Sequence, residues 1–528
     1  MMPIIHRREW LWAAVWSLII LVVACLPYLY GAAISTPTDP FSGFVIGIED
    51  GNSYLAKMQE GRSGYWLFQL AYTPEPHPGE LFFIFYILLG KLAGWLNWPN
   101  SIVFHLSKLI TIPLSVLASY FFMAYFIERV RLRQIALLIL SFSGGLGWLW
   151  LVLGGSAQLG KMPVDLWVPD ASFFLASLTF AHLPLAQGLL LLFAITSLDF
   201  IQTGQKNLGL IAAGCGLVVS LIHPYTLPII GTILGLYILW QFYRQRQVWL
   251  NTTRLLLITL PSLPYLIYVL WVFSYNPTFI AWKDQSLTYS PAPIHYLLGF
   301  GFTLLLALLG LWVTRQQTDY KQQFLRIWII SVPFLLYIPL ALQRRFLDSY
   351  QAPLAVLAAV GLAWLLERMA RQRWRANFLG FILLWMSLTN ILLMVGAVIT
   401  ISQKPATIFL TASEVAAAHW LSEQEGPVVV LSLYQTGNYL PTVANVRAFA
   451  GHGPETVNSD EKRAQAKAFF SDAVDDAWRR ALLEKFDVRY IYYSPNEKAG
   501  GGLVPSRTPY LKEIYRNEDV QIFEINLP

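Results

Sequence analysis

Residues 10–30 read WLWAAVWSLIILVVACLPYLY, an apolar run without a charged side chain. A helix needs roughly 20 apolar residues to cross the hydrocarbon core of a bilayer, so this run predicts a membrane-spanning helix. Arg7 and Arg8 precede it, as in a signal peptide, but the run has no clear small-residue cleavage site. We therefore predict a retained first helix with the N-terminus on the cytoplasmic side.

Apolar runs of similar length recur as far as residue 401. Hydrophobic residues make up 56% of the chain and charged residues 13%, a composition that excludes a soluble enzyme. Cys25 and Cys215 fall inside apolar runs, which favours buried thiols over a disulfide framework or a metal cluster. We predict a polytopic α-helical membrane protein with about eleven transmembrane helices. The predicted spans are 10–30, 102–126, 135–153, 185–203, 208–226, 227–243, 255–274, 293–313, 325–342, 352–367 and 378–400.

The net charge of +6 reflects basic residues that flank the spans and does not indicate nucleic-acid binding. Short cytoplasmic loops are enriched in Lys and Arg, so we expect the basic clusters to lie inside. The clusters are Arg129/Arg131/Arg133, Arg244/Arg246/Arg254, Arg315/Lys321/Arg326 and Arg368/Arg371/Arg373/Arg375. The apolar segment 81–97 breaks this pattern if it spans, and it is short and carries Lys91. We predict that 81–97 is an interfacial helix along the outer face.

With this topology, Arg344 and Arg345 lie outside, where the charge rule predicts few basic residues. The outer segments are 31–101, about 154–184, the turn near Pro224, 275–292, 343–351 and everything after about 402. The arginine pair could anchor to lipid headgroups or clamp an anion, because guanidinium forks match phosphate geometry and stay charged. We favour the clamp. A phosphate on the outer side of a bilayer suggests a lipid-linked phosphate.

After Lys404 the composition becomes that of a soluble domain. We divide the chain into a transmembrane domain, 1–403, and an extracytoplasmic α/β domain, 404–528. The pattern predicts a capped helix from Thr411 or Ser413, helices at 460–471 and 472–485, and strands at 427–434, 488–493 and 519–525, with a Gly/Pro-rich loop at 495–509. For the loop 451–456, GHGPET, we favour a structural turn over a site.

Several outer-loop residues could carry chemistry. In the first loop, Glu49 and Asp50 precede a helical segment. They could form a solvated helix start with Asp50 as the cap. Alternatively, they could supply a general base or a metal ligand that faces a membrane-level cavity. The second loop holds Asp165 and Asp170, each also suited to a turn, and then His182. For His223, at a predicted helix-to-helix turn, we favour packing over catalysis.

These features together resemble the GT-C superfamily of membrane glycosyltransferases, which use polyprenyl-phosphate-linked sugars. The superfamily includes oligosaccharyltransferase catalytic subunits, protein O-mannosyltransferases and lipid A aminoarabinose transferases. Asp50 and Tyr54 keep the spacing of its Asp-Glu-x-x-aromatic motif, although Gly51 stands at the second acid and Glu49 precedes the aspartate. Three prolines stiffen the approach to segment 81–97, where His77-Pro78-Gly79 is similar to a shortened basic-Pro-Pro-x-Gly step.

The resemblance implies transfer of a hexosyl or pentosyl group from a polyprenyl phosphate or diphosphate to an acceptor on the outer face, with inversion. The partners are this donor, an acceptor that is protein, lipid or glycan, and the lipids of the plasma or inner membrane. A divalent cation, Mg²⁺ or Mn²⁺, is left open as cofactor. The implied site residues are Asp50 and Glu49 for catalysis, Asp165 or Asp170 as the second-loop acid, Arg344 and Arg345 for the donor phosphate, and Tyr54 and His77 in support.

Two other classes of protein compete with this interpretation. A lipid or solute transporter would place ionisable or interrupted helices near the bilayer midplane and often contains repeats, whereas the candidate residues here cluster in outer loops. A non-catalytic membrane assembly factor would dock partners through 404–528. Such a factor would tolerate loss of Asp50.

Overall fold

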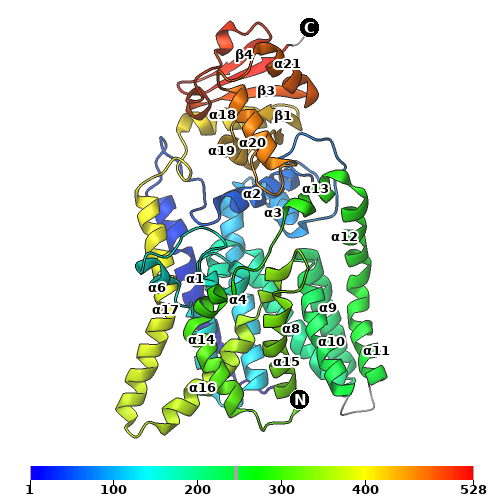
Figure 1. Cartoon of the computed structure of the whole chain (residues 1–528), viewed down its shortest axis with the longest axis vertical. Coiled ribbons are helices and arrows are strands. Elements are labelled where there is room, and N and C mark those ends of the chain that lie inside the picture. Colours follow the sequence, from blue (N-terminus) through cyan, green and yellow to red (C-terminus); the bar gives the residue numbers. More distant parts are fainter. Residues whose placement is uncertain (1, 243–247, 527–528) are drawn as a thin grey trace. The chain divides into compact units, whose positions relative to one another are not determined.

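The computed structural model describes residues 2–242 and 248–526, and the chain packs as two compact units (Figure 1). Unit 1 comprises Met1–Leu26, Ser107–Val269 and Thr288–Gly396, and unit 2 comprises Pro27–Leu106, Leu270–Leu287 and Ala397–Pro528. The predicted boundary at 403/404 follows composition, whereas packing groups the first loop with the C-terminal segment. Arg244, Arg246 and the end of the predicted span 227–243 lie outside the described residues.

The chain is a helical membrane protein. Among the residues that the structure describes, eight helical stretches are long and apolar enough to cross a membrane. Six are single helices: α1 (Arg7–Ala33), α4 (Asn100–Phe126), α8 (His182–Thr203), α14 (Pro293–Val313), α16 (Gln351–Arg368) and α17 (Gln372–Ser402). The other two combine α5 (Val130–Phe142) with α6 (Gly147–Val152), and α11 (Val248–Thr259) with α12 (Leu263–Tyr275).

The remaining predicted spans form shorter helices. The segments 208–226 and 227–243 correspond to α9 (Lys206–Ile222) and α10 (Thr226–Phe242), each of 17 residues. The segment 325–342 corresponds to α15 (Tyr320–Leu335), which ends two residues beyond Pro333. The predicted span 135–153 is interrupted between α5 and α6, where Gly145 lies against the backbone of Leu298 and Gly299. Short connecting helices are α7 (Phe173–Thr179) and α13 (Pro277–Gln285).

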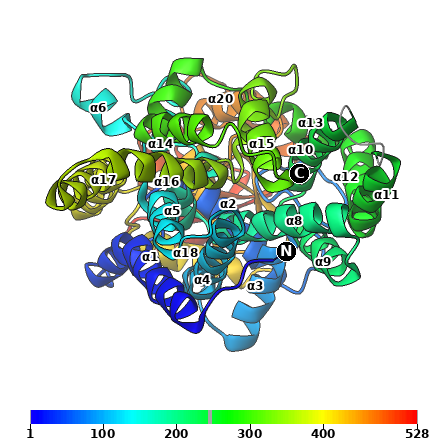
Figure 2. The same cartoon turned by 90° about the horizontal axis from the view of Figure 1, so that it is seen from below.

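Close helix packing builds the core of unit 1. Helix α16 lies between α14 and α5 (Figure 2). A Cβ atom at Gly310 would lie 2.0 Å from the carbonyl oxygen of Leu357, and one at Gly361 would lie 2.2 Å from that of Leu306. Glycine at both positions therefore lets the backbones of α14 and α16 approach, as small residues do between membrane helices.

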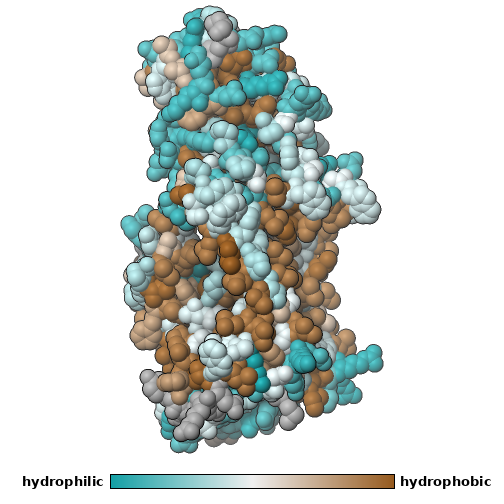
Figure 3. Space-filling view, turned by 90° about the vertical axis from the view of Figure 1, so that its right-hand side faces the viewer, coloured by the Kyte–Doolittle hydropathy of each residue, from teal (hydrophilic) through white to brown (hydrophobic). Residues whose placement is uncertain are grey.

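The outward side chains of the helices are apolar. On α11, Trp249 is 85% exposed and Leu256 is 63% exposed. Hydrophobic side chains cover much of the helical part of the face in Figure 3. Each Å² of apolar surface costs about 25 cal/mol in contact with water, so this surface suits lipid.

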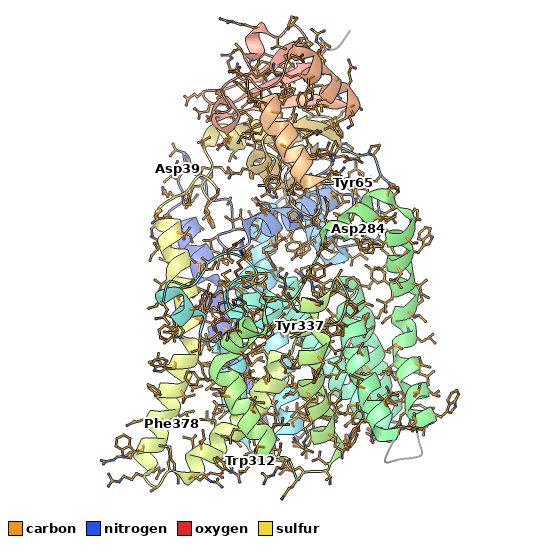
Figure 4. All side chains as sticks on the ribbon, in the orientation of Figure 1. Asp39, Tyr65, Asp284, Trp312, Tyr337 and Phe378 are labelled. Carbon is orange, nitrogen blue, oxygen red and sulfur yellow. The ribbon has the colours of Figure 1, made fainter. Side chains whose placement is uncertain are left out.

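The loops of unit 1 gather at two ends of its helices, marked by Trp312 and Tyr337 in Figure 4. At the end of Trp312, Arg129 pairs with Glu367 at 2.6 Å, and Lys321 Nζ donates to a backbone carbonyl in α4 at 3.2 Å. The predicted cytoplasmic clusters that contain Arg129, Lys321 and Arg368 therefore lie at the same end of the helices. The side of the membrane that this end faces stays a prediction.

The first loop in unit 2 forms α2 (Ile48–Arg62) and α3 (Ile84–Leu96). The N-cap of α2 is Gly47, in the left-handed conformation at φ 64°, so the interpretation of Asp50 as the cap is wrong. Asp50 lies in the first helical turn instead. At 13 residues, α3 reaches about 20 Å, less than the roughly 30 Å that a span needs. Its position along the membrane surface stays a prediction.

The C-terminal segment of unit 2 forms a mixed five-stranded sheet in the order β2-β1-β3-β5-β4. The strands are β1 (Val428–Leu431), β2 (Val446–Ala448), β3 (Val488–Tyr493), β4 (Leu511–Arg516) and β5 (Gln521–Ile525). Strands β1, β2 and β3 are parallel, whereas β5 is antiparallel to β3 and β4. The helices are α18 (Ala412–Ser422), α19 (Tyr434–Tyr439), α20 (Ser459–Phe469), α21 (Asp476–Lys485) and α22 (Pro495–Lys498).

Side chains alternate between the two faces of this sheet. Ile491 packs with α20 and α21, whereas Tyr490 and Tyr492 pack with α18. The predicted cap of α18 is confirmed at Thr411, which forms a capping box with Glu414. The predicted helices and the three predicted strands are present. The sequence analysis missed β2, which has only three residues, and β4, half of whose residues are exposed.

Candidate functional site

Arg344 and Arg345 lie on η4 (Gln343–Leu347), a short 3₁₀ helix in the link between α15 and α16. The backbone N–H of Arg344 donates to the carbonyl oxygen of Thr288 at 3.0 Å, which fixes η4 against a neighbouring loop. Arg345 Nη1 lies 3.1 Å from Oδ1 and 3.3 Å from Oδ2 of Asp170, on η2 (Pro169–Ala171). We refer to Arg344, Arg345 and Asp170 as the arginine cluster.

Aromatic rings support both guanidinium groups of this cluster. The guanidinium carbon of Arg344 lies 4.4 Å from the ring centre of Trp167, and that of Arg345 lies 4.7 Å from the ring centre of Tyr225. Stacking of this kind holds a guanidinium by its face and leaves the N–H edges for ligands. Within the described residues, Nε of Arg344 is buried and has no hydrogen-bond partner. The cluster therefore keeps an unsatisfied donor.

Burial and charge oppose each other in the arginine cluster. Burial alone would raise the pKa of Asp170, but the positive charge of Arg345, with His223 and Arg344, outweighs it and holds that pKa below its ordinary value. Burial lowers the pKa of Arg344, against the opposing effect of Asp170. A guanidinium remains protonated in proteins. The cluster thus contains two cations and one carboxylate.

A buried histidine lies beside the cluster. His223 Nδ1 lies 3.3 Å from Oδ2 of Asp348, and Thr226 Oγ1 bridges the two, at 2.7 Å and 2.9 Å respectively. Its Nε2 forms a hydrogen bond with the hydroxyl of Tyr225, whose ring supports Arg345. Because both ring nitrogens are engaged, the geometry makes His223 a support for Tyr225.

Asp165 contacts a backbone turn. Its Oδ2 accepts hydrogen bonds from the backbone N–H groups of Gly145 at 2.8 Å and Gly147 at 3.2 Å, at the turn between α5 and α6. Burial raises the pKa of Asp165 to about 6. Of the two second-loop aspartates, Asp170 is the one that contacts an arginine, and Asp165 caps a turn.

Asp50 projects from the first turn of α2, and its side chain is 57% exposed. Its Oδ1 lies 3.2 Å from Nε2 of His452, which is only 6% exposed. The predicted turn at 451–456 holds this histidine, and the Thr456 hydroxyl accepts its backbone N–H at 3.3 Å. The loop aspartate and the C-terminal turn thus meet within unit 2.

A buried ion pair lies behind His452. Lys57 lies on α2, two turns after Asp50. Its Nζ lies 2.7 Å from Oε1 of Glu455, and the side chains of Lys57 and Glu455 are 1% and 6% exposed. The Ser53 hydroxyl donates to the same oxygen at 2.8 Å. Burial would raise the pKa of Glu455, but Lys57 and His452 together hold it below its ordinary value. Glu455 is therefore a carboxylate in the neutral pH range.

The other first-loop residues of the prediction have different surroundings. Glu49 accepts a hydrogen bond of 2.9 Å from the hydroxyl of Tyr434, which lies on α19. Tyr54 stacks on Tyr86, with ring centres 4.4 Å apart. His77 accepts the backbone N–H of Leu70 through Nε2 at 2.9 Å, so its Nδ1 donates to the carbonyl oxygen of Glu75 at 2.8 Å. His77 thereby fixes its own loop.

The predicted site residues fall into two groups, one in each unit. Unit 2 holds Asp50, Glu49, Tyr54 and His77, and unit 1 holds Asp165, Asp170, Arg344 and Arg345. Sequence analysis missed His452, Glu455 and Lys57 as part of the Asp50 site. The available signal was weak: a His and a Glu three residues apart in a glycine-containing turn.

Metal-ligating side chains do not cluster within the described residues. In the part of the chain that the structure describes, no group of three or more His, Cys, Asp or Glu side chains could hold a metal ion. The Asp50 site instead pairs its carboxylates with His452 and Lys57. The Mg²⁺ or Mn²⁺ left open by the sequence stays untested.

The apolar helices, the helical first loop and the C-terminal mixed sheet define a helical membrane protein with a GT-C-like fold. Over 96% of this chain and 97% of the other, it is similar to ArnT from Cupriavidus metallidurans, with a TM-score of 0.52 and 13% identity. It is also similar to the Archaeoglobus fulgidus oligosaccharyltransferase, over 91% of this chain and 69% of the other, with a TM-score of 0.51 and 15% identity.

A third similarity involves only part of the other protein. The whole of this chain matches 40% of the arabinofuranosyltransferase AftD from Mycobacteria, with a TM-score of 0.58 and 12% identity. No protein-family model and no curated protein sequence matches the chain. These similarities concern the fold.

Proposed function

We propose that this protein is a membrane glycosyltransferase that moves a sugar from a polyprenyl phosphate or diphosphate to an acceptor on the extracytoplasmic face, with inversion. The observation that carries the proposal is the buried Nε of Arg344, which has no hydrogen-bond partner within the described residues and lies beside Arg345 at one end of a bundle of membrane helices. The GT-C-like fold supports the same conclusion. A lipid-linked phosphate is an anion that such a cluster fits.

The arginine cluster binds the donor phosphate in this proposal. Arg345 is held in place by Asp170, and Arg344 lies against Trp167 with its Nε available. As the bond between the sugar and the carrier breaks, its electron pair remains on the phosphate oxygen. Two guanidinium groups stabilise that charge more strongly in a water-poor site than in bulk water.

Asp50 is the general base. The acceptor's nucleophilic atom attacks the anomeric carbon, its proton passes to the Asp50 carboxylate, and the carrier phosphate leaves from the opposite face of the sugar. A single displacement of this kind inverts the anomeric centre. Asp50 is favoured over Glu49 because its carboxylate is exposed, whereas the Glu49 carboxylate already accepts a hydrogen bond from the Tyr434 hydroxyl.

Binding of a polyprenyl phosphate without a sugar tests the anion site, because it does not require the sugar to be known. In nanodiscs, we expect wild-type protein to bind a fluorescent short-chain polyprenyl phosphate. R344M and R345M should each weaken binding at least tenfold, whereas R507M, at an exposed arginine of η6 (Pro505–Arg507), should not. Equal affinity of R344M, R345M and wild type would overturn the anion site.

Turnover tests the base. With a panel of synthetic polyprenyl-phosphate sugars and cell-envelope extracts as acceptors, wild type should release free polyprenyl phosphate. D50N should retain binding of polyprenyl phosphate and lose turnover by about 10²-fold or more. A D50N variant with wild-type turnover contradicts the assignment. Donor translocation across proteoliposomes without sugar transfer would identify a transporter instead.

A further inference from the structure

The C-terminal segment contributes a chain of alternating charges to the Asp50 site. Starting from the most buried residue, Lys57 contacts Glu455 at 2.7 Å, Glu455 lies 4.0 Å from Nδ1 of His452, and Nε2 of His452 contacts Asp50 at 3.2 Å. Exposure rises along the chain from 1% at Lys57 to 57% at Asp50. The chain thus links a buried ion pair to an exposed carboxylate.

We infer that His452 is a positioning residue for the Asp50 carboxylate and that Glu455 keeps the His452 ring charged, an inference that rests on the proposed function. A carboxylate on the first turn of a helix can rotate about its side-chain bonds. A charged N–H donor at Oδ1 restricts that rotation, and charge-assisted hydrogen bonds are roughly twice as strong as neutral ones. The C-terminal segment then completes the base that the first loop carries.

The groups around His452 favour its charged form. Asp50 and Lys57 face it from α2, Glu455 faces it from its own turn, and the Tyr72 ring lies 5.7 Å away. Burial works against the charge, but Glu455 and Asp50 outweigh burial and Lys57, so the pKa of His452 lies above its ordinary value. The 4.0 Å separation from Glu455 is too long for a hydrogen bond, so this contact acts through charge.

The pH dependence of turnover separates positioning from a purely structural role. If the charged ring positions Asp50, kcat of the full-length protein falls as the pH rises through the pKa of His452. E455Q removes one of the two negative charges that raise this pKa, so the alkaline fall should move to lower pH. H452Q retains a neutral donor without a titrating ring. It should lose the alkaline fall and lower kcat about 10- to 100-fold, the size of effect seen when residues that orient metal ligands are replaced.

Two further variants keep the test decisive. E455Q leaves Lys57 buried without its partner carboxylate, so K57M/E455Q removes both charges in a folded protein. The alkaline fall should move in the same direction in this double variant but by less, because Lys57 itself lowers the pKa of His452. H419Q changes an exposed histidine on α18 and should leave the pH profile unchanged. In all His452 and Glu455 variants, the affinity for polyprenyl phosphate should remain within twofold of wild type.

The result that overturns the inference is a normal kcat and an unchanged alkaline limb in H452Q and K57M/E455Q, while D50N is inactive. Full turnover of D50N is a different result. It would reject Asp50 as the base and with it the proposed mechanism. The two failures are therefore distinguishable in one set of variants.

Discussion

Arg345 Nη1 lies 3.1 Å from Oδ1 of Asp170, although 175 positions separate the two residues in the chain. Asp165, five residues before Asp170, instead accepts the backbone N–H groups of the α5–α6 turn. The two aspartates share a loop and a residue type, yet one serves a charged cluster and the other a backbone turn. Substitution of Asp170 should therefore change ligand affinity, whereas substitution of Asp165 should change the stability of the fold.

We expect D170A to weaken binding of polyprenyl phosphate about tenfold, equivalent to about 1.4 kcal/mol, because Arg345 loses the partner that fixes its guanidinium. D165A leaves two backbone N–H groups without their acceptor, and should destabilise the protein by about 1–3 kcal/mol with unchanged affinity. Thermal unfolding in detergent and ligand titration together give both values. Loss of affinity in D165A alone would contradict this division.

Arg344 should not be replaceable by lysine. R344K keeps the charge but lacks the planar group that stacks on Trp167 and a fork that can engage two phosphate oxygens. We expect about tenfold weaker binding in R344K, with a similar loss across a range of salt concentrations. If R344K binds as wild type does, the cluster requires only charge at this position.

The Lys57–Glu455 pair should dominate the stability of unit 2 near the Asp50 site. K57M removes the nearest cation from the buried Glu455 carboxylate, and breaking such a pair typically costs about 3–5 kcal/mol. K57M/E455Q should recover most of that loss. A thermal melt followed by circular dichroism checks both, and a K57M protein with the wild-type midpoint would refute the expectation.

Acid should weaken unit 2 through Glu455. Its pKa in the folded protein is lower than its ordinary value of 4.5, so the stability it contributes is present above pH 4.5 and is lost as the pH falls through the folded pKa. We expect the unfolding midpoint to drop in this acidic range, and to drop less in K57M/E455Q. Melting curves from pH 7 to pH 3 measure both, and equal slopes would exclude Glu455 as the cause.

Two glycines of α3 should respond differently to alanine. A Cβ atom at Gly90 would lie 1.8 Å from the carbonyl oxygen of Met58, whereas one at Gly94 would meet Arg62 Cγ at an ordinary 3.4 Å. G90A should therefore push α3 away from α2 and destabilise by about 1–3 kcal/mol. G94A should be neutral or stabilise by up to about 1 kcal/mol, because alanine favours the helix. Equal melting midpoints would mean that α3 can shift without penalty.

Local sequence patterns predicted most elements but not the shortest ones. Thr411 and Glu414 have the spacing of a capping box, so the start of α18 could be predicted from the sequence. The strand β2 has three residues and forms because β1 offers it an edge, a tertiary effect that no local pattern carries. The start of α2 was misplaced because Gly47 adopts a left-handed conformation that the acidic pair nearby does not indicate.

The sequence by itself determined the class of protein, because the length of an apolar run and the charges at its ends depend on neighbouring residues alone. It also singled out Arg344 and Arg345, as basic residues where the charge rule predicts few, and Asp50, as a carboxylate before a helical segment of the first loop. Only the tertiary structure showed that Asp170 contacts Arg345 whereas Asp165 accepts backbone N–H groups, and only it brought His452 and Glu455 to Asp50. Contacts across 175 and 402 positions form when separate elements pack, so no local spacing encodes them.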